Sequence, residues 1–227
     1  MPDTASKVTE QEHPIIFNEW SIRRILTGAK TQTRRVVKNV RRDNTVKLDE
    51  NTVRHVTDHL EACPFGQPGD ELWVREAFRF PKSHDTLSPS EYVSKSGYER
   101  GIPGRVRYEA DGTRAYEVAG LDVAPSLEWG RKRPSIHMPR ELCRLRLRVE
   151  DVRVERVQEI THEGALSEGI EMVDGPGDVD KAYGRHTEGY TESARFAFRN
   201  LWNEIHGDGA WERNDWVWVV SFEIIKE

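Results

Sequence analysis

The chain has few cysteines and no long apolar segment. Only two cysteines occur among its 227 residues, and neither belongs to a C-x-x-C pair, so the sequence predicts reduced thiols and not a disulfide framework. No run approaches the roughly 18 apolar residues of a membrane span, and the polar N-terminus lacks the apolar region of a secretory signal. We therefore expect a cytoplasmic protein without a membrane partner.

Spacings typical of metal ligands are also missing. His55 and His59 stand four positions apart, but no third ligand follows at a spacing that zinc sites use. We expect no metal and no cofactor. Charged residues make up 32% of the chain and hydrophobic residues 36%, and the seven tryptophans indicate a packed core in a polar protein.

Acidic residues are absent from residues 20–42, which hold eight Lys or Arg although the whole chain has a formal net charge of -5. Such local concentration of positive charge is typical of a site for a polyanion. The segment contains the pattern G-x-K-T-x-T-x-R, from Gly28 to Arg35. We expect the function to lie here.

Phosphate groups of a nucleic acid are the expected ligands of these cations. The candidates are Arg23, Arg24, Arg34, Arg35, Arg41 and Arg42, with Arg144, Arg146 and Arg148 from a later strand. The alternative is a solvated basic face that the acids elsewhere balance. Trp129 and Tyr98 are candidates for stacking on a base, whereas Trp73, in an apolar strand, is expected in the core.

Apolar spacing and turn residues predict the elements of the first half. We expect strands over 13–17, 31–37 and 71–76, and a helix that Asn18 caps and that ends before Gly28. Residues 38–62 lack a period and are predicted to be a loop. Residues 81–134 are polar and rich in Gly, Pro and Ser, which indicates an insertion, with a small hairpin near 105–110.

The second half shows clearer periods. Apolar residues alternate with basic ones from Cys143 to Glu150, which predicts a strand with one face in the core and a basic face opposite. Helices are expected after Thr161 and after Thr191, separated by a loop over 174–189, and a final strand over 216–225.

These elements predict an α+β fold. Strands outnumber helices and are too irregularly spaced for βαβ repeats, so we expect a mostly antiparallel β-barrel with flanking helices and a long polar insertion. The barrel would form a single domain over 14–227, with the insertion at about 81–134, after a frayed N-terminus over 1–13.

Four stretches in this order resemble the ASCH-domain proteins of the PUA-like superfamily, in the longer form often met in bacteriophages and prophages. They are ILTGAKTQTRR, PFGQPGDELWVREAF, the stretch that begins RPSIHMPRELC and runs through ALSEGI, and FRNLWNEIHGDGAWERNDWVWVVSFE. The resemblance covers roughly residues 14–80 and 131–227. It implies a PUA-like barrel with a cleft for RNA, single-stranded nucleic acid or a modified nucleoside.

The resemblance also implies catalytic residues. A small bacterial member is an amidohydrolase of N4-acetylcytidine that uses a Lys, a Thr and a Glu, and by position these are Lys30, Thr33 and Glu168. Many members carry Glu at the Thr33 position, so the threonine favours the hydrolase type. Other members are ribonucleases or only bind, and a non-catalytic reader of modified nucleic acid and a ribonuclease stay open as alternatives.

Two chemical arrangements of this trio are open. In one, a neutral Lys30 activates the Thr33 hydroxyl and Glu168 handles the leaving amine; in the other, a charged Lys30 polarises the carbonyl and Glu168 is the base. The structural alternatives are a strand threonine, a phosphate-binding lysine and a surface acid.

Overall fold

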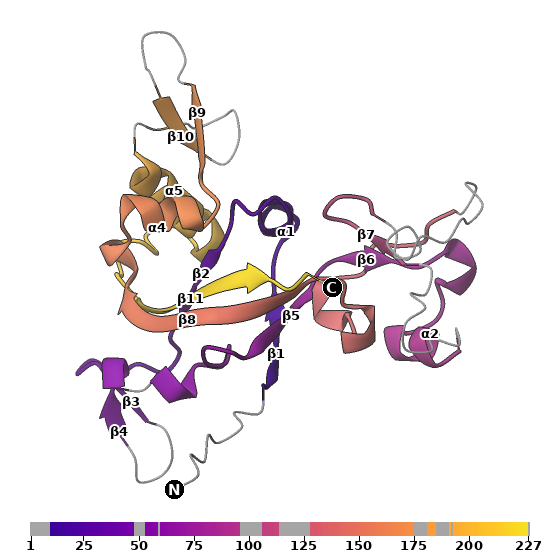
Figure 1. The fold of residues 1–227 in the computed structure, drawn as a ribbon, viewed down its shortest axis with the longest axis horizontal. Coiled ribbons are helices and arrows are strands. Elements are labelled where there is room, and N and C mark those ends of the chain that lie inside the picture. The colour runs from indigo at the N-terminus through magenta and orange to yellow at the C-terminus, as the bar shows by residue number, and fades with distance from the viewer. Residues whose placement is uncertain are drawn as a thin grey trace, which may run out of the picture.

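The computed structural model describes residues 10–47, 53–58, 60–95, 106–113, 128–174, 181–184, 191 and 193–226. Its centre is a five-stranded sheet in the order β1-β5-β8-β11-β2 (Figure 1). In this order the strands are β1 (Glu12–Ile16), β5 (Glu71–Arg75), β8 (Arg146–Arg156), β11 (Trp216–Ile224) and β2 (Gln32–Val36). β1 runs parallel to β5 and the other pairs are antiparallel. The α+β class is thus confirmed.

The sheet is not closed into the expected barrel. In the part of the chain that the structure describes, the edge strands β1 and β2 have no backbone pairing with each other. A side chain crosses the gap instead, because Arg35 of β2 donates from Nη2 to the carbonyl oxygen of Ile16 in β1 at 2.6 Å. The prediction was wrong because alternation shows which residues face a core, whereas closure depends on pairing between strands far apart in the sequence.

The sheet lies between two apolar cores, and β11 contributes to both. Its residues Trp218, Val220 and Phe222 pack in one core, with side chains of β1, β5, β8 and α1 (Glu19–Leu26). Val217 and Val219 point to the other face, against α4 (His162–Ser167) and α5 (Ala194–His206). This alternation explains why the last strand is apolar at nearly every position.

Two of the three predicted helix caps are confirmed. The Asn18 side chain accepts a hydrogen bond from the Ser21 amide at 2.8 Å, and Thr161 accepts one from the Gly164 amide at 3.0 Å. The expected cap at Thr191 is wrong: Thr191 pairs with Tyr183 in an isolated bridge, and Ser193 is the residue that precedes α5.

Two short ribbons lie in segments that were expected to be loops. One joins β3 (Thr45–Lys47) to β4 (Val53–His55), and the other joins β9 (Glu171–Asp174) to β10 (Lys181–Gly184). Both project away from the central sheet in Figure 1. Single 3-10 turns cover Val56–Asp58, Leu60–Ala62, Lys82–His84, Ser135–His137, Arg140–Leu142 and Val157–Glu159. Strands of three or four residues are too short to give a readable period.

The described parts of residues 81–134 add no strand to the central sheet. They contain α2 (Pro89–Lys95) and β7 (Arg107–Tyr108), which pairs with β6 (Phe78–Arg79). A separate aromatic core holds them together, and its members are Phe78, Phe80, Tyr92, Val106, Tyr108, Met138 and Leu142. No helix among the described residues has the length and apolar character needed to cross a membrane.

Candidate functional site

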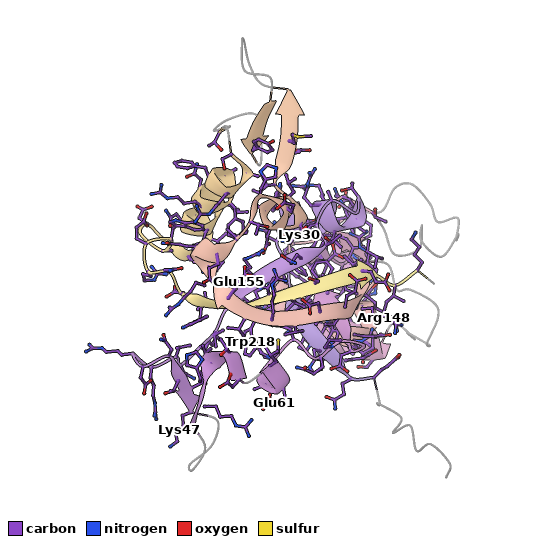
Figure 2. The ribbon with its side chains drawn as sticks, turned by 60° about the vertical axis from the view of Figure 1, so that its left-hand side comes forward. Lys30, Lys47, Glu61, Arg148, Glu155 and Trp218 are labelled. Atoms are coloured by element: carbon purple, nitrogen blue, oxygen red, sulfur yellow. The ribbon has the colours of Figure 1, made fainter. Side chains whose placement is uncertain are left out.

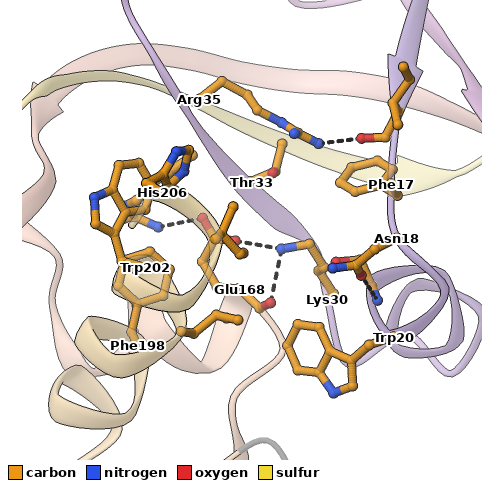
Figure 3. Close-up of a pocket in the computed structure, with 15 residues that line it drawn as sticks. Phe17, Asn18, Trp20, Lys30, Thr33, Arg35, Glu168, Phe198, Trp202 and His206 are labelled. Atoms are coloured by element: carbon orange, nitrogen blue, oxygen red, sulfur yellow. Dashed lines mark hydrogen bonds and ion pairs between the residues drawn. The ribbon is translucent and has the colours of Figure 1, made fainter. Parts of the chain in front are cut away.

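A pocket of about 220 Å³ lies where the sheet fails to close. Its walls come from the end of β1, the start of α1, β2, and the C-terminal half of α5 (Figure 3). The lining residues are Ile16, Phe17, Asn18, Trp20, Ser21, Lys30, Thr33, Arg34, Arg35, Glu168, Phe198, Leu201, Trp202, Ile205 and His206. The volume is below the roughly 300–1,000 Å³ of pockets for drug-sized ligands, so it suits a small group.

The structure brings Lys30, Thr33 and Glu168 together in this pocket. Lys30 Nζ lies 2.5 Å from Glu168 Oε2 and donates a second hydrogen bond to the Glu168 carbonyl oxygen at 2.9 Å. Thr33 is only 4% exposed, and Figure 3 shows its hydroxyl facing the same hollow as the Lys30 ammonium. Segments 138 residues apart therefore supply one buried cluster.

Local backbone geometry fixes the lysine and the glutamate. Glu168 is the C-cap of α4, where carbonyl groups lack helical partners, so Lys30 satisfies one of them. Lys30 and Glu168 also form an isolated β-bridge. Gly169 has φ of +95°, and a Cβ atom there would lie 3.3 Å from Lys30 Cβ. A glycine at this position thus permits both the turn and the close approach of the lysine.

Arg34 extends the cluster into a chain of alternating charges. Its Nη1 donates to Glu168 Oε1 at 3.2 Å, and its Nε donates to Glu155 Oε1 at 2.9 Å. The Arg34 side chain is 1% exposed. Because two carboxylates neutralise this buried guanidinium, it organises Glu168 and is not presented to a phosphate. The sequence pattern did not indicate Glu155.

Burial lowers the pKa of Lys30. Glu168 opposes this by stabilising the ammonium, and the neighbouring charges of Arg35 and Arg34 add to the lowering. Desolvation is the largest contribution to this lowering, so the Lys30 ammonium loses its proton at a lower pH here than it would in water.

Aromatic side chains form the two walls. Phe17 and Trp20 stand on one side of Lys30, and Phe198, Trp202 and His206 on the other (Figure 3). The Trp202 and His206 rings are 4.1 Å apart. No sequence pattern pointed to these residues as a group. The spacing of residues 198, 202 and 206 is the available signal, since residues four apart share a helix face.

Arg35 lines the pocket with a free donor. Its guanidinium lies 5.0 Å from the Phe17 ring centroid, and its Nη2 bonds to Ile16. Arg35 Nε is buried and has no hydrogen-bond acceptor among the described residues.

Ion pairs away from the pocket engage Arg144, Arg146 and Arg148, the arginines of the predicted basic face. Arg144 binds Glu76 through two hydrogen bonds of 2.7 and 2.9 Å and also contacts Asp111. Arg146 and Arg148 pair with Glu71 and Glu10. Figure 2 shows Arg148 and Glu155 at opposite ends of β8, with Lys30 beside the Glu155 end. Acidic residues from distant segments therefore largely neutralise the predicted basic face.

The other predicted contacts are scattered. Arg24 bonds to Glu171 at 2.7 Å, and Arg23 bonds to the carbonyl oxygen of Ala110 at 2.7 Å. Trp129 pairs with Pro81 in the insertion, away from the pocket lining. Arg41 is exposed and lies in a separate groove.

Two more aromatic predictions have different outcomes. Trp73 is half-buried beneath Arg75 and is not part of a core cluster, so the expectation of a core residue is wrong. It alternates with the inward-facing Leu72 and Val74, which places it on the outer face of β5. Tyr98 lies outside the described residues.

No group of three His, Cys, Asp or Glu side chains that could hold a metal ion occurs within the described ranges. Comparisons with protein families, with curated proteins and with solved structures find no match to this chain.

Proposed function

We propose that the pocket binds an acylated cytosine and that Thr33, Lys30 and Glu168 hydrolyse its amide bond. The observation that carries this proposal is the buried Lys30–Glu168 pair beside the Thr33 hydroxyl in one pocket with aromatic walls. The resemblance of the G-x-K-T-x-T-x-R segment to the amidohydrolase type of ASCH protein supports the same roles. Phe17, Trp20 and Trp202 line the pocket, and aromatic rings of this kind are the ones on which proteins stack bases.

The lowered pKa of Lys30 favours the arrangement in which the neutral amine is the base. Lys30 Nζ takes the hydroxyl proton of Thr33, and Thr33 Oγ bonds to the acyl carbon. The carbon–nitrogen bond then breaks, and Lys30 returns the proton to the departing N4 amine. Lys30 Nζ then takes a proton from a water molecule whose oxygen bonds to the acyl carbon. The bond between that carbon and Thr33 Oγ breaks, Lys30 returns the proton to Thr33 Oγ, and the carboxylic acid is released.

Glu168 and Arg35 have supporting roles in this scheme. Glu168 holds Lys30 through two hydrogen bonds and stabilises the ammonium that forms after proton transfer. The unpaired Arg35 Nε lines the same pocket and can donate to the oxyanion of the tetrahedral intermediate.

Release of cytidine from N4-acetylcytidine, followed by chromatography, tests the proposal. We expect turnover by the unmodified protein and none with N4-methylcytidine, which has no amide bond. Binding of acylated cytosine without turnover would contradict the hydrolase and identify a reader. Strand cleavage of unmodified RNA would indicate a ribonuclease.

The pH dependence distinguishes the two roles of Lys30. If the neutral amine is the base, kcat/KM rises with pH and levels off below the ordinary lysine pKa of about 10.4, because burial lowers the pKa of this group. A rate that instead falls as pH increases through this range would show that the charged lysine is required. Initial rates in buffers of constant ionic strength provide the measurement.

A further inference from the structure

A second, strongly basic groove of about 690 Å³ lies next to the end of β2. Five of its lining side chains are cationic, and Asp215 is the one carboxylate among the described residues that line it. The lining residues are Val36, Val37, Lys38, Asn39, Val40, Arg41, Arg42, Asn44, Arg156, Arg213, Asp215 and Trp216.

The exposed cations of this groove differ from the paired cations of the insertion. Lys38, Arg41 and Arg42 are exposed, and none of them forms an ion pair with a described residue. Asp43 is close enough to Arg41 for that charge to lower its pKa, but its carboxylate bonds to Thr45. By contrast, a hollow in the insertion has comparable positive charge that is already paired: Arg131 and Arg133 with Asp85, and Lys132 with Glu19.

The groove is built on an ordered turn. Asn39 and Asn44 adopt positive φ angles of 60° and 62°, and Arg41 donates from its backbone amide to the Thr45 carbonyl oxygen at 2.8 Å. The Asn44 side chain accepts hydrogen bonds from Arg156 Nη2 at 2.7 Å and from Trp216 Nε1 at 3.0 Å. Arg156 lies 4.1 Å from the Trp216 ring centroid. The site thus combines fixed positive charge with an aromatic face.

The groove and the pocket are neighbours. β2 supplies Thr33 and Arg35 to the pocket, and the residues that follow, from Val36 onward, line the groove. Burial lowers the pKa of His206, which lines the pocket, and the charges of Arg35 and Arg213 lower it further. Arg35 of the pocket and Arg213 of the groove thus both lie near His206, and Asp215, the partner of Arg213, opposes their effect.

We propose that this groove, formed by Lys38, Arg41, Arg42, Arg156 and Arg213, binds the phosphodiester backbone of a single-stranded nucleic acid. The inference rests on the proposed function, and it makes a strand, rather than a free nucleoside, the substrate. Lys38, Arg41 and Arg42, which form no ion pair with a described residue, match consecutive phosphates along a groove, whereas Arg213 already pairs with Asp215 at 3.2 Å. A single strand is required because a base in a duplex cannot enter a walled pocket without leaving the stack.

The test is the triple variant Lys38→Gln, Arg41→Gln, Arg42→Gln. Fluorescence anisotropy with a labelled single-stranded oligonucleotide that carries one N4-acetylcytosine gives its affinity across a salt series. We expect at least about 10-fold weaker binding at low salt and a salt slope that is smaller by about 2, since single strands contribute roughly 0.7 per phosphate contact. The kcat/KM for the oligonucleotide should fall at least about 10-fold more than that for free N4-acetylcytidine.

The matched control removes three cations of the insertion that are paired with Glu128, Asp85 and Glu19: Lys82→Gln, Arg131→Gln, Lys132→Gln. Its salt slope should equal that of the unmodified protein. A slope unchanged in the groove variant, or reduced equally in the control, would overturn the proposal. So would polyglutamate that competes as well as an oligonucleotide of equal charge, because the groove would then fit an acidic protein.

These experiments can refute the groove and the hydrolase independently of each other. If the unmodified protein shows no turnover but the groove variant loses oligonucleotide affinity, the groove stands and the hydrolase falls. If free nucleoside is hydrolysed and oligonucleotide affinity does not depend on the groove, the groove falls alone.

Discussion

Thr33→Val is expected to abolish hydrolysis of N4-acetylcytidine, with a loss of about 100-fold or more in kcat. Valine keeps the branched shape of threonine on β2 but has no hydroxyl to form the ester. Because Thr33 is buried opposite Val220 of β11, the similar volume should leave the sheet intact. Steady-state kinetics and the denaturation midpoint of the same preparation separate the chemical effect from the structural one.

Thr33→Ser is the matched control for this variant. The hydroxyl remains, so measurable activity should persist, although loss of the methyl group leaves its position less fixed. If the valine variant retains kcat within about threefold of the unmodified protein, Thr33 is not the nucleophile, and direct attack by water must replace it.

Glu168→Met is expected to destabilise the fold by roughly 3–5 kcal/mol, which is the usual cost of leaving a buried charge without its partner. Lys30 and Arg34 both lose a contact, but Arg34 keeps Glu155. Urea denaturation measures the free energy of unfolding. Adding Lys30→Met to this variant should restore part of the loss, since it removes the unpaired ammonium.

The loss of folding stability caused by Glu168→Met should also depend on pH. Without Glu168, burial lowers the folded-state pKa of Lys30 further, so the unfolded chain binds more protons than the folded one between the two pKa values. Stability of the variant therefore rises with pH, and its deficit relative to the unmodified protein shrinks as pH rises toward the ordinary lysine pKa of about 10.4.

Glu212→Met provides the control for the loss of an ion pair. Glu212 pairs with Arg199 at 2.7 Å, but its side chain is 54% exposed, so solvent screens the interaction. Its removal should cost less than about 1 kcal/mol with little pH dependence. Equal losses for Glu168→Met and Glu212→Met would contradict a buried, coupled Lys30–Glu168 pair.

Local signals in the sequence predicted much of the fold. The Asn18 and Thr161 caps, the glycines after α1 and α5, and the alternation around Leu147 all depend on neighbouring residues, and the structure confirms them. The start of α5 was misplaced because Thr191 and Ser193 are both competent caps, and the choice depends on a contact between Thr191 and Tyr183.

Non-local relations were harder to predict. Alternation placed Arg144, Arg146 and Arg148 on one face, but it could not reveal that Glu76 and Glu71 would neutralise two of them. The same limit applies to the open sheet and to Glu155. Lys30, Thr33 and Glu168 were named through a family resemblance, and the structure places them in one pocket.

The pairing of β5 with β8 has a consequence for how far the segment between these strands can vary in length. Trp73 lies opposite Arg146, so everything between these strands, including the aromatic core around Phe80, is topologically one hairpin loop. Closing a loop costs only about 0.6 kcal/mol more for each doubling of its length. Residues can therefore be added to this connection or removed from it at little entropic cost, provided that Ala110 keeps its place in the core of the central sheet and its hydrogen bond from Arg23.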